Sequence, residues 1–361
     1  MFMNTIKKVN LVKKILLSNF GYLKLPYKLT FAITYKCNSK CKTCNIWSKN
    51  SSNELSLKEI ENFSEKTDFF SWFNLTGGEP FLRKDLVSIV NTFQNNSPNL
   101  LFLNLTTNGL LPDLIKERVQ EILSLNLPMT VVVVSLDGPK GVHDSIRGMH
   151  GSWDKAVETY KLLRDLSEEK NNFQTFLGFT LSSLNFGKVE ETYSSVKELI
   201  PKIESKDFHF NLLHFSKHYY SNVNDDQNII QAENKERLIN DLEEIEKIKK
   251  SSLLNPVQFL ERKYVQLAKK FVETGKTPLS CKAIQTSCFI DPEGNVYPCT
   301  IYDKNLGNLR NFDYDLGKIL KLDFVKGLIK EIEKLNCPNC WTPCEAYQTI
   351  LGNLKNLRLN L

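Results

Sequence analysis

Between residues 28 and 218 the chain alternates between short apolar runs and longer segments of helical periodicity. The apolar runs predict six strands, at Leu29–Thr34, Trp72–Thr76, Leu101–Thr106, Thr130–Ser135, Thr175–Leu181 and Phe208–His214. The segments between them predict helices near Ser56–Thr67, Arg83–Asn95, Leu111–Leu125, Ser152–Glu168 and Gly187–Ile200. Strict alternation predicts an α/β fold with a parallel sheet, either a partial barrel or an open doubly wound sheet. In both, ligands bind at the carboxyl ends of the strands.

The first 20 residues predict an amphipathic helix, because their apolar residues recur at steps of three or four. The stripe consists of Ile6, Val9, Val12, Leu16 and Phe20. Lysines interrupt every apolar stretch, so no signal-peptide core forms. We favour the interpretation in which this stripe packs against the main domain. The alternative is a basic helix that lies on a membrane surface.

We expect five segments along the chain. They are the N-terminal amphipathic helix (1–28), the βα core (29–220), a helical bridge (221–276), a small cysteine-rich domain (277–345) and a C-terminal helix (346–361). The bridge shows helical patterns at Asn228–Lys250 and Pro256–Glu273, whose many charges we place on solvated faces. The tail from Glu345 to Leu361 carries Leu351, Leu354 and Leu357 on one helical face, which we assign to packing.

Composition is that of an ordinary globular protein, with 41% hydrophobic and 24% charged residues and a net charge of +6. The nine cysteines fall into two groups, with none between Cys44 and Cys281. An odd number in a chain of 361 residues argues against a disulfide scaffold. The two groups therefore predict two metal sites in a reducing compartment, the cytoplasm.

The first group, Cys37, Cys41 and Cys44, has the spacing C-x3-C-x2-C and directly follows the first predicted strand. A structural zinc site uses four closed ligands, and an electron-carrying cube uses four cysteines. Three thiolates hold only three irons of a [4Fe–4S] cluster and leave the fourth iron open. The pattern therefore predicts a cluster that takes a further ligand, which we expect to be the substrate of a redox reaction.

The next three strands also end in polar or glycine-containing loops. These loops are Thr76-Gly77-Gly78-Glu79-Pro80, Thr106-Thr107-Asn108-Gly109 and Ser135-Leu136-Asp137-Gly138-Pro139. A single such loop is an ordinary turn. Four consecutive strand ends with this character, the first carrying the cysteines, predict a binding site at one rim of the sheet.

These residues together resemble the radical S-adenosylmethionine (radical SAM) superfamily over Leu29 to His214, as a partial (β/α)6 TIM-like barrel. The resemblance implies that the three cysteines hold the reducing cluster, whose open iron chelates the amino and carboxylate groups of SAM. It implies SAM contacts for the residues Gly77, Gly78, Glu79, Thr107, Asn108, Ser135, Asp137 and Arg147. Glu79 and the glycine backbone would receive the amino group, and Arg147 would pair with the carboxylate. The family often has an aromatic residue before the third cysteine, where this chain has Thr43, so Ile46 and Trp47 are the alternative adenine contacts.

The second cysteine group predicts a hairpin, with Phe289 and Ile290, a turn at Asp291–Asn295, then Val296 and Tyr297. Its C-x17-C spacing from Cys281 to Cys299, with Gly294 inside, resembles the SPASM/Twitch extension of radical SAM enzymes, which binds auxiliary [4Fe–4S] clusters. We favour one auxiliary cluster. Its expected ligands are Cys281, Cys299, Cys337 and Cys340, with Cys288 and Cys344 as alternates. A zinc knuckle built from the same thiols is the competing interpretation.

The resemblance implies an enzyme that cleaves SAM to a 5′-deoxyadenosyl radical and abstracts hydrogen from a peptide or small-molecule substrate. An electron donor such as flavodoxin or ferredoxin is then needed. Candidate proton donors or acceptors are His214, His218 and Tyr219, for which a structural role is the alternative. Sulfatase-maturing members carry Asp at the position of Thr300, which argues against that activity.

Two alternatives to a peptide or small-molecule substrate stay open. If the N-terminal helix contacts a membrane, a lipid or isoprenoid substrate gains weight. A non-catalytic iron–sulfur or zinc scaffold is the other alternative, although it would not need an open iron. No nucleic acid partner is expected, because no arginine-rich patch with interleaved aromatics occurs.

Overall fold

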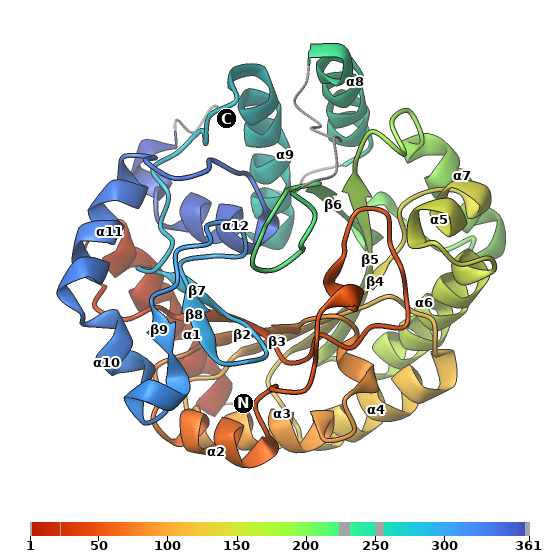
Figure 1. Cartoon of the computed structure of the whole chain (residues 1–361). Helices are drawn as coiled ribbons and strands as arrows, with labels where there is room; N and C mark the ends of the chain where they lie inside the picture. Colours follow the sequence, from red (N-terminus) through yellow and green to blue (C-terminus); the bar gives the residue numbers. More distant parts are fainter. Residues whose placement is uncertain (1, 22, 224–231, 250–255, 358–361) are drawn as a thin grey trace.

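The computed structural model describes residues 2–21, 23–223, 232–249 and 256–357, and a nine-stranded sheet forms its centre. The strand order is β6-β5-β4-β3-β2-β1-β7-β8-β9, and the sheet curves with helices around its outside (Figure 1). The first six strands are β1 Lys28–Ala32, β2 Trp72–Thr76, β3 Phe102–Thr107, β4 Thr130–Ser135, β5 Phe173–Leu181 and β6 Phe208–Leu212. All of them are parallel. The predicted parallel α/β fold is confirmed.

Helices follow the strands as the periodicity predicted. They are α2 Leu57–Glu65, α3 Leu86–Asn96, α4 Pro112–Ser124, α6 Ser152–Glu169 and α7 Val189–Leu199. The predicted capping box is present, since Ser56 accepts from the Glu59 amide and the Glu59 carboxylate accepts from the Ser56 amide at 2.9 Å. The bridge forms α8 Ala232–Ile248 and α9 Pro256–Thr274, and the start of the helix predicted at Asn228 lies outside the described residues.

One helix of the core was not predicted, α5 Lys140–Arg147. Only His143 and Ile146 of its eight residues are buried. That leaves too few apolar positions for a helical stripe to be visible in the sequence. Because α5 ends at Arg147, it nevertheless delivers a side chain of the candidate site.

The alternation of β2 explains how the sheet separates a packed face from a polar one. Phe73 and Leu75 point outward into the hydrophobic core, whereas Trp72, Asn74 and Thr76 line a cavity on the inner face. On the outer face, Phe73 packs on Phe93 of α3, with ring centroids 4.3 Å apart. Aromatic contacts of this kind fix the helices against the sheet and leave the inner face free for polar residues.

The C-terminal region continues the same sheet instead of building a separate one. Strand β7 Ser287–Ile290 pairs in parallel with β1, with Cys288 opposite Leu29. It forms the predicted hairpin with β8 Asn295–Tyr297, and β9 Gly307–Asn308 adds an edge. Three helices follow, α10 Leu316–Leu320, α11 Asp323–Glu333 and α12 Pro343–Leu351. The sequence showed the hairpin, but not that it would pair with the first strand of the barrel.

The helix predicted over Glu345–Leu361 ends earlier, at Leu351. Gly352 and Asn353 follow, and the Asn353 side chain donates to the carbonyls of Thr349 and Ser280 at 2.8 and 2.9 Å. The first bond satisfies a carbonyl group in the last turn of α12, and the second joins the helix end to the segment before β7. A short 3-10 turn forms at Leu354–Asn356, and residues 358–361 lie outside the described part.

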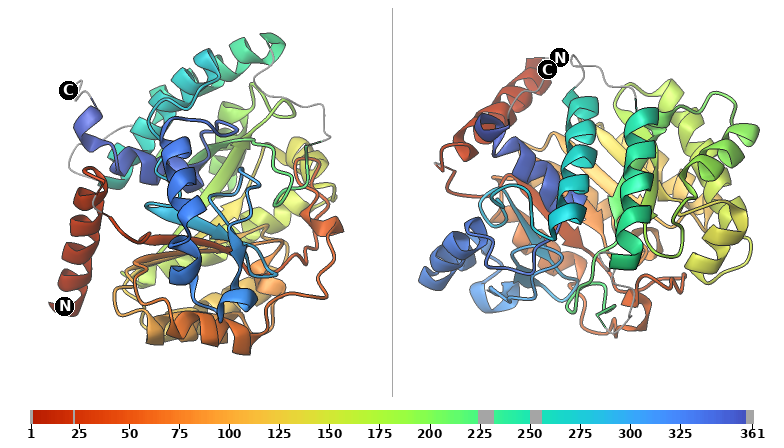
Figure 2. Two further views of the ribbon diagram at one scale, coloured as in Figure 1. Left: turned by 60° about the vertical axis from the view of Figure 1, so that its left-hand side comes forward. Right: turned by 90° about the horizontal axis from the view of Figure 1, so that it is seen from above.

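The N-terminal helix α1 Phe2–Ser18 forms as predicted, but the favoured interpretation of its stripe is wrong. The packed face is a different one, where Leu11 contacts Tyr27 and Leu101. The predicted stripe points to solvent, with Val9, Leu16 and Phe20 exposed by 60%, 53% and 62%. The sequence pattern showed that the helix has an apolar face, but not which face of the helix would pack against the barrel. Figure 2 shows α1 at the outer edge of the molecule. Among the described helices, none is both long and apolar enough to cross a bilayer.

The aromatic packing on the outer face of β2 leads to a stability prediction. We expect Phe73→Ala to lower the free energy of unfolding by about 3–5 kcal/mol, because a fully buried ring is replaced by a cavity. Urea unfolding of the two proteins measures this difference. The matched control is Phe324→Ala, since Phe324 is 50% exposed and should change stability by less than about 0.5 kcal/mol. Equal effects of both substitutions would contradict the assignment of the core.

Candidate active site

The loop after β1 brings Cys37, Cys41 and Cys44 to one cavity at the carboxyl ends of the strands. The loop is tied down locally. The Ser39 hydroxyl lies 3.1 Å from the Cys41 sulfur and donates to the Arg147 carbonyl at 3.0 Å. Burial, with a smaller effect of charge on Cys41, raises the pKa of Cys37 to about 11 and that of Cys44 to about 12. The three sulfurs therefore face the same space and sense one another electrostatically.

Gly77 and Gly78 allow the loop after β2 to lie directly against the chain that leads to the cysteines. A Cβ atom on Gly77 would stand 2.3 Å from the Thr34 carbonyl oxygen, and one on Gly78 would stand 2.2 Å from that of Lys36. Gly77 also has φ +141°, which favours glycine. The amide of Gly78 donates to the Thr34 carbonyl at 2.7 Å. Both glycines line the cavity. Because these glycines have no side chains, the loop after β2 can pack directly against the cysteine loop, and more of the cavity stays free for a ligand.

Glu79 is 1% exposed and directs its carboxylate toward the loop after β3. It accepts hydrogen bonds from the Asn108 amide at 2.7 Å, the Thr107 hydroxyl at 3.0 Å and the Phe81 amide at 3.2 Å. Burial raises its pKa to about 7, against the opposing effect of these bonds. Thr107 and Asn108 line the cavity, whereas Glu79 is not among the described residues that line it. In this structure Glu79 therefore positions two of the predicted binding residues from behind the wall.

Asn108 connects the third strand to the cysteine loop. Its side-chain amide donates to Asn38 Oδ1 at 2.7 Å and approaches the Cys37 sulfur at 3.9 Å. The third strand and the cysteine loop are therefore held at a fixed spacing.

Arg147 connects the fourth strand to the same loop through a buried ion pair. Its Nη2 lies 2.6 Å from Asp137 Oδ2, and its Nη1 is 3.7 Å from the Cys41 sulfur. Asp137 in turn accepts from the Thr180 amide at 3.0 Å. A buried pair of this kind is held by its additional hydrogen bonds, because both charges lose solvent. Asp137, Ser135 and Arg147 all line the cavity, as predicted for a single rim.

His143, which the sequence did not single out, supports Asp137 from α5. Its Nδ1 accepts the Asp137 amide proton at 3.0 Å, which requires the neutral ring with its proton on Nε2. Burial, with a further effect of the nearby Arg147 charge, lowers the pKa of His143 to about 3. A neutral imidazole is thus built into the support of the fourth strand end.

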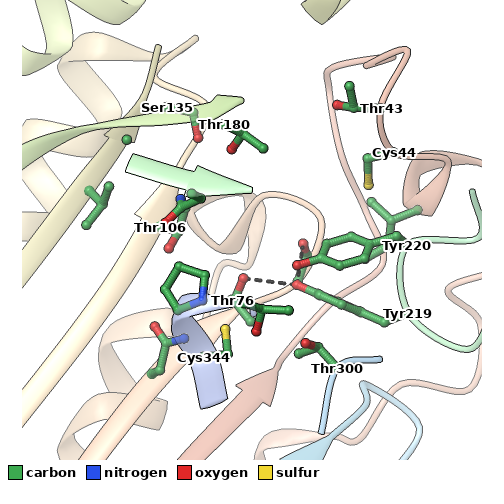
Figure 3. A pocket seen from close by; sticks show the side chains of 18 of the residues that line it. Thr43, Cys44, Thr76, Thr106, Ser135, Thr180, Tyr219, Tyr220, Thr300 and Cys344 are labelled. Atoms are coloured by element: carbon green, nitrogen blue, oxygen red, sulfur yellow. Dashed lines mark hydrogen bonds between the residues drawn. The ribbon is translucent and has the colours of Figure 1, made fainter. Parts of the chain in front are cut away.

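The cavity has a volume of about 330 Å³ and is lined by polar side chains from all six barrel strands (Figure 3). The inward residues with hydroxyl or amide groups are Thr30, Asn74, Thr76, Asn104, Thr106, Ser135, Thr180 and Asn211. The register places Thr30 opposite Asn74, and Asn74 opposite Asn104. These inward residues were not predicted as site residues. The sequence does show them, as the polar positions of each alternating strand.

Several buried polar atoms at this cavity have no hydrogen-bond partner among the described residues. They include the hydroxyls of Thr30, Thr300 and Thr342. Each of these residues lines the cavity and is less than 5% exposed. Buried hydroxyls are normally paired, so their orientation marks a place built for a polar ligand. The lining also contains Lys28, whose ammonium donates to the Cys344 carbonyl and to Gln348 Oε1.

Of the candidate proton-transfer residues, Tyr219 and His214 line the cavity, and His218 is not among the described residues that line it. The Tyr219 hydroxyl lies 3.1 Å from Thr76 Oγ1 and 3.4 Å from the Gly77 carbonyl, and Tyr220 lies between Tyr219 and Cys44 (Figure 3). Both ring nitrogens of His214 are engaged, with the Leu212 carbonyl at 2.8 Å and the Trp341 amide at 2.8 Å. Those of His218 lie 3.1 Å from the Cys299 carbonyl and 3.3 Å from Ser216 Oγ. The geometry favours the structural alternative for both histidines.

The possible adenine contacts of the sequence analysis all reach the same cavity. Thr43, Ile46 and Trp47 are part of its lining. Ile46 and Trp47 belong to the short 3-10 turn that directly follows the third cysteine of the loop. Apolar surface is therefore available beside the cysteines despite Thr43.

In the C-terminal group, the four favoured cysteines interact electrostatically with one another. Burial raises the pKa of Cys299, and charge on Cys340 and Cys281 raises it further. The pKa of Cys340 responds in the same way to Cys281 and Cys337. The Thr277 hydroxyl lies 3.2 Å from the Cys340 carbonyl and 3.1 Å from its amide, which ties the Cys337–Cys340 turn beside Cys281.

The two alternates occupy different places. Cys288 is fully buried on β7, where the carboxylate of Glu345 is the charge that most affects its thiol. Cys344 lies in the first turn of α12 and lines the central cavity (Figure 3). The arrangement is therefore more favourable to the predicted set than to either alternate.

Each cysteine group offers thiolates as its donor set, which is the set that iron–sulfur clusters use. Within the described part of the chain, no three His, Cys, Asp or Glu side chains are placed to bind one metal ion. The thiolates that bind a [4Fe–4S] cluster lie farther apart than the ligands of a single metal ion, because each thiolate binds a different iron. The residues that would hold the first cluster are Cys37, Cys41 and Cys44.

Comparison with known proteins agrees with this geometry. Residues 31–194 match the model of the radical SAM superfamily. The chain belongs to the radical SAM superfamily. Residues 281–345 of this radical SAM protein match the model of the iron–sulfur cluster-binding domain called SPASM. Members of the superfamily are enzymes that bind iron–sulfur clusters and SAM.

Individual relatives are distant. The chain is 24% identical over 81% of its length to the antilisterial bacteriocin subtilosin biosynthesis protein AlbA of Bacillus subtilis, and covers 59% of that protein. It is 30% identical over 47% of its length to the Fe-coproporphyrin III synthase of Methanosarcina barkeri, and covers 41% of it. This radical SAM chain thus spans about half the length of these curated relatives.

Solved structures share the fold. A structure of anSMEcpe with bound AdoMet matches 84% of the chain and 83% of its own, with a TM-score of 0.58 and 18% identity. Streptococcus suis SuiB bound to its precursor peptide SuiA matches 89% of the chain and 72% of its own, with a TM-score of 0.57 and 17% identity. These likenesses show the fold of the radical SAM protein over most of its length.

The neutral state of His143 predicts a pH dependence of stability. The native ring binds no proton until the pH approaches 3, whereas the unfolded ring binds one below its ordinary pKa of 6.5. The unfolded state therefore holds more protons between these values, and stability falls as the pH is lowered through this window. We expect His143→Asn, whose Oδ1 can accept the same amide proton, to reduce this loss by up to about 1.4 kcal/mol per pH unit.

Urea unfolding at several pH values between 7 and the start of acid unfolding measures the effect of the His143 variant. The matched control is His150→Asn, because the His150 side chain is 99% exposed, although its Nδ1 lies 3.6 Å from Asp144 Oδ2. The same pH slope in the His143 variant and the original protein would contradict the prediction.

Proposed function

We propose that this chain cleaves SAM reductively and uses the resulting radical to abstract hydrogen from a peptide. The observation that carries the proposal is one cavity with two kinds of wall. One wall holds the cysteines Cys37, Cys41 and Cys44, and the remainder is the polar inner face of the barrel. The proposed cofactor site and the proposed substrate site therefore belong to one continuous cavity.

The chemistry that the bound cluster supplies is one electron, which breaks a carbon–sulfur bond of SAM to give methionine and the 5′-deoxyadenosyl radical. The chain's own residues would bind and orient. Thr107, Asn108, Ser135 and Asp137 line the rim where the sugar and amino acid parts of SAM are expected. Arg147 offers a buried guanidinium, already oriented by Asp137, to a carboxylate. The role of Glu79 would be to fix Thr107 and Asn108 in place, more than to contact SAM itself.

Tyr219 is the side chain we propose for contact with the substrate beside the cofactor. Burial raises the pKa of its hydroxyl far above neutrality, so the group stays protonated and acts as a hydrogen-bond donor. Its two partners, Thr76 and the Gly77 carbonyl, hold the ring at the boundary between the cysteine loop and the lumen. A substrate carbonyl that replaces the Gly77 carbonyl as the acceptor of this single proton would be held in place while hydrogen is removed nearby.

The polar inner face supports a substrate rich in amide or hydroxyl groups. Side-chain amides of Asn74, Asn104 and Asn211 each offer both donors and acceptors, which complements a peptide backbone. Relatives point the same way, since SuiB binds a precursor peptide and AlbA takes part in bacteriocin biosynthesis. A lipid or isoprenoid chain would need an apolar channel, because burying these polar groups against hydrocarbon leaves them unpaired.

A first experiment tests SAM cleavage. After anaerobic reconstitution with iron and sulfide, we expect about eight irons per chain, four for each cube. With SAM and dithionite the protein should form 5′-deoxyadenosine, and Cys41→Ala should abolish it, because one ligand of the first cluster is lost. Liquid chromatography with mass spectrometry measures the product. Flavodoxin or ferredoxin, the proposed natural donors, would replace dithionite.

Matched cysteine variants serve as controls for the two clusters. Cys340→Ala should lose about four irons and keep the first cluster, whereas Cys288→Ala should keep all of them. No 5′-deoxyadenosine from protein with an intact first cluster would contradict the proposed cleavage of SAM.

A second experiment tests the substrate class. Peptide, small-molecule and lipid fractions prepared from the cells that contain this protein are added to the reconstituted enzyme. We expect the peptide fraction to stimulate 5′-deoxyadenosine formation and protease digestion to remove that stimulation. Stimulation that survives the protease, or that resides in the lipid extract, would contradict a peptide substrate while leaving SAM cleavage intact.

A further inference from the structure

The N-terminal helix presents a row of large apolar side chains to solvent. Val9, Val12 and Leu16 are 60%, 54% and 53% exposed, and Ile6 and Phe20 continue the row at 46% and 62%. Phe20 is contacted from one side by the Lys355 ammonium, 5.4 Å from the ring centre. Four of these side chains lie on about three turns of α1, and Phe20 follows two residues after the end of the helix; the five together form a stripe, called here the α1 outer face. An apolar patch of this kind on a protein surface marks a binding surface.

The helix itself is firmly attached by its opposite side. Leu11 is 7% exposed against Tyr27 and Leu101. The Lys14 ammonium donates to the Phe69 carbonyl at 2.6 Å and to Ser71 Oγ at 3.0 Å, and Asn10 donates to Asn99 at 2.9 Å. Because these polar contacts orient the helix, its outward apolar face cannot turn inward without breaking them. The exposure of the stripe is therefore part of the fold.

The charges on α1 and in the segment that follows it are all of one sign. The first 53 residues contain no aspartate or glutamate, and the first acidic residue is Glu54. Lys8 and Lys13 on α1, and Lys24 just after it, are exposed. An apolar stripe bordered by lysines, with no acidic residue near it in sequence, complements an anionic bilayer surface in both charge and hydrophobicity.

We propose that the α1 outer face binds the surface of an anionic lipid bilayer. The five apolar side chains enter the boundary between head groups and acyl chains, and the lysines contact lipid phosphates. The helix lies in the plane of the membrane, because its packed side remains bound to the barrel. This binding is independent of the proposed reaction and needs neither cluster nor SAM.

The attachment also sets the orientation of the enzyme. Helix α1 contacts residues at the amino ends of β1, β2 and β3, whereas the cavity opens at their carboxyl ends. In Figure 2 the helix and the cysteine loop lie at opposite sides of the molecule. Strands of this length separate the two ends by about 17–20 Å. The membrane-bound enzyme therefore keeps its cavity on the side away from the bilayer, where it receives a substrate from water.

Vesicle flotation with the 361-residue chain tests the proposal. We expect the protein to float with vesicles made of equal parts phosphatidylglycerol and phosphatidylcholine, and more weakly with phosphatidylcholine alone. Val9→Asp should reduce binding about tenfold or more, since a charge replaces an inserted side chain. Changing both Lys8 and Lys13 to Gln should reduce binding to the anionic vesicles about fivefold per lysine, and binding to neutral vesicles little.

The matched control is Leu199→Asp, which places the same charge on an apolar side chain that is 56% exposed on α7, away from the α1 outer face. Circular dichroism and thermal unfolding verify that each variant is folded. Three outcomes would overturn the proposal. They are no flotation of the original protein with anionic vesicles, equal loss in the Val9 and Leu199 variants, and a dimer in solution that Val9→Asp dissociates. The last result would assign the face to a second copy of the chain.

Discussion

Strand β1 is the element on which the rest of the structure depends. It is hydrogen-bonded to β2 on one side and to β7 on the other, and all five of its residues are buried. The cysteine loop leaves its carboxyl end, and the hairpin that leads to Cys299 is anchored on its other edge. A strand fixed on both edges and both faces has little freedom to move. The two cysteine groups are consequently held in one rigid frame although more than 200 residues separate them in sequence.

Local contacts fix the other strand ends of the site relative to β1 and the cysteine loop. The glycine pair presses the second strand end against the first, and Glu79 fastens the third strand end through Thr107 and Asn108. The Asp137–Arg147 ion pair joins the fourth to the cysteine loop. These contacts are short and largely buried, so the strand ends that surround the cavity are held at fixed distances from one another. A substitution at one link would displace residues that it does not touch.

The sequence predicted those features that depend on short-range pattern. Alternating runs located all six barrel strands, and the spacing of Cys37, Cys41 and Cys44 identified their chemistry. Features set by long-range packing were not predictable in this way. The exposed face of α1 depends on Lys14 and Leu11 finding partners far along the chain. The pairing of β7 with β1 joins residues about 260 positions apart, which no local pattern encodes. Helix α5 was missed because its stabilising contacts, such as His143 with Asp137, are polar.

The unpaired hydroxyls of Thr30, Thr300 and Thr342 have a consequence for finding what the protein binds. A buried hydroxyl without a partner costs about 1–3 kcal/mol, and water or a ligand can remove that cost. A ligand that pairs with these groups binds the native state and has no site in the unfolded chain. Native stability must then rise with ligand concentration, by about 2.7 kcal/mol at a hundred times the dissociation constant. Binding of a ligand in the polar cavity would therefore raise the melting temperature of the protein, which can be measured without any turnover.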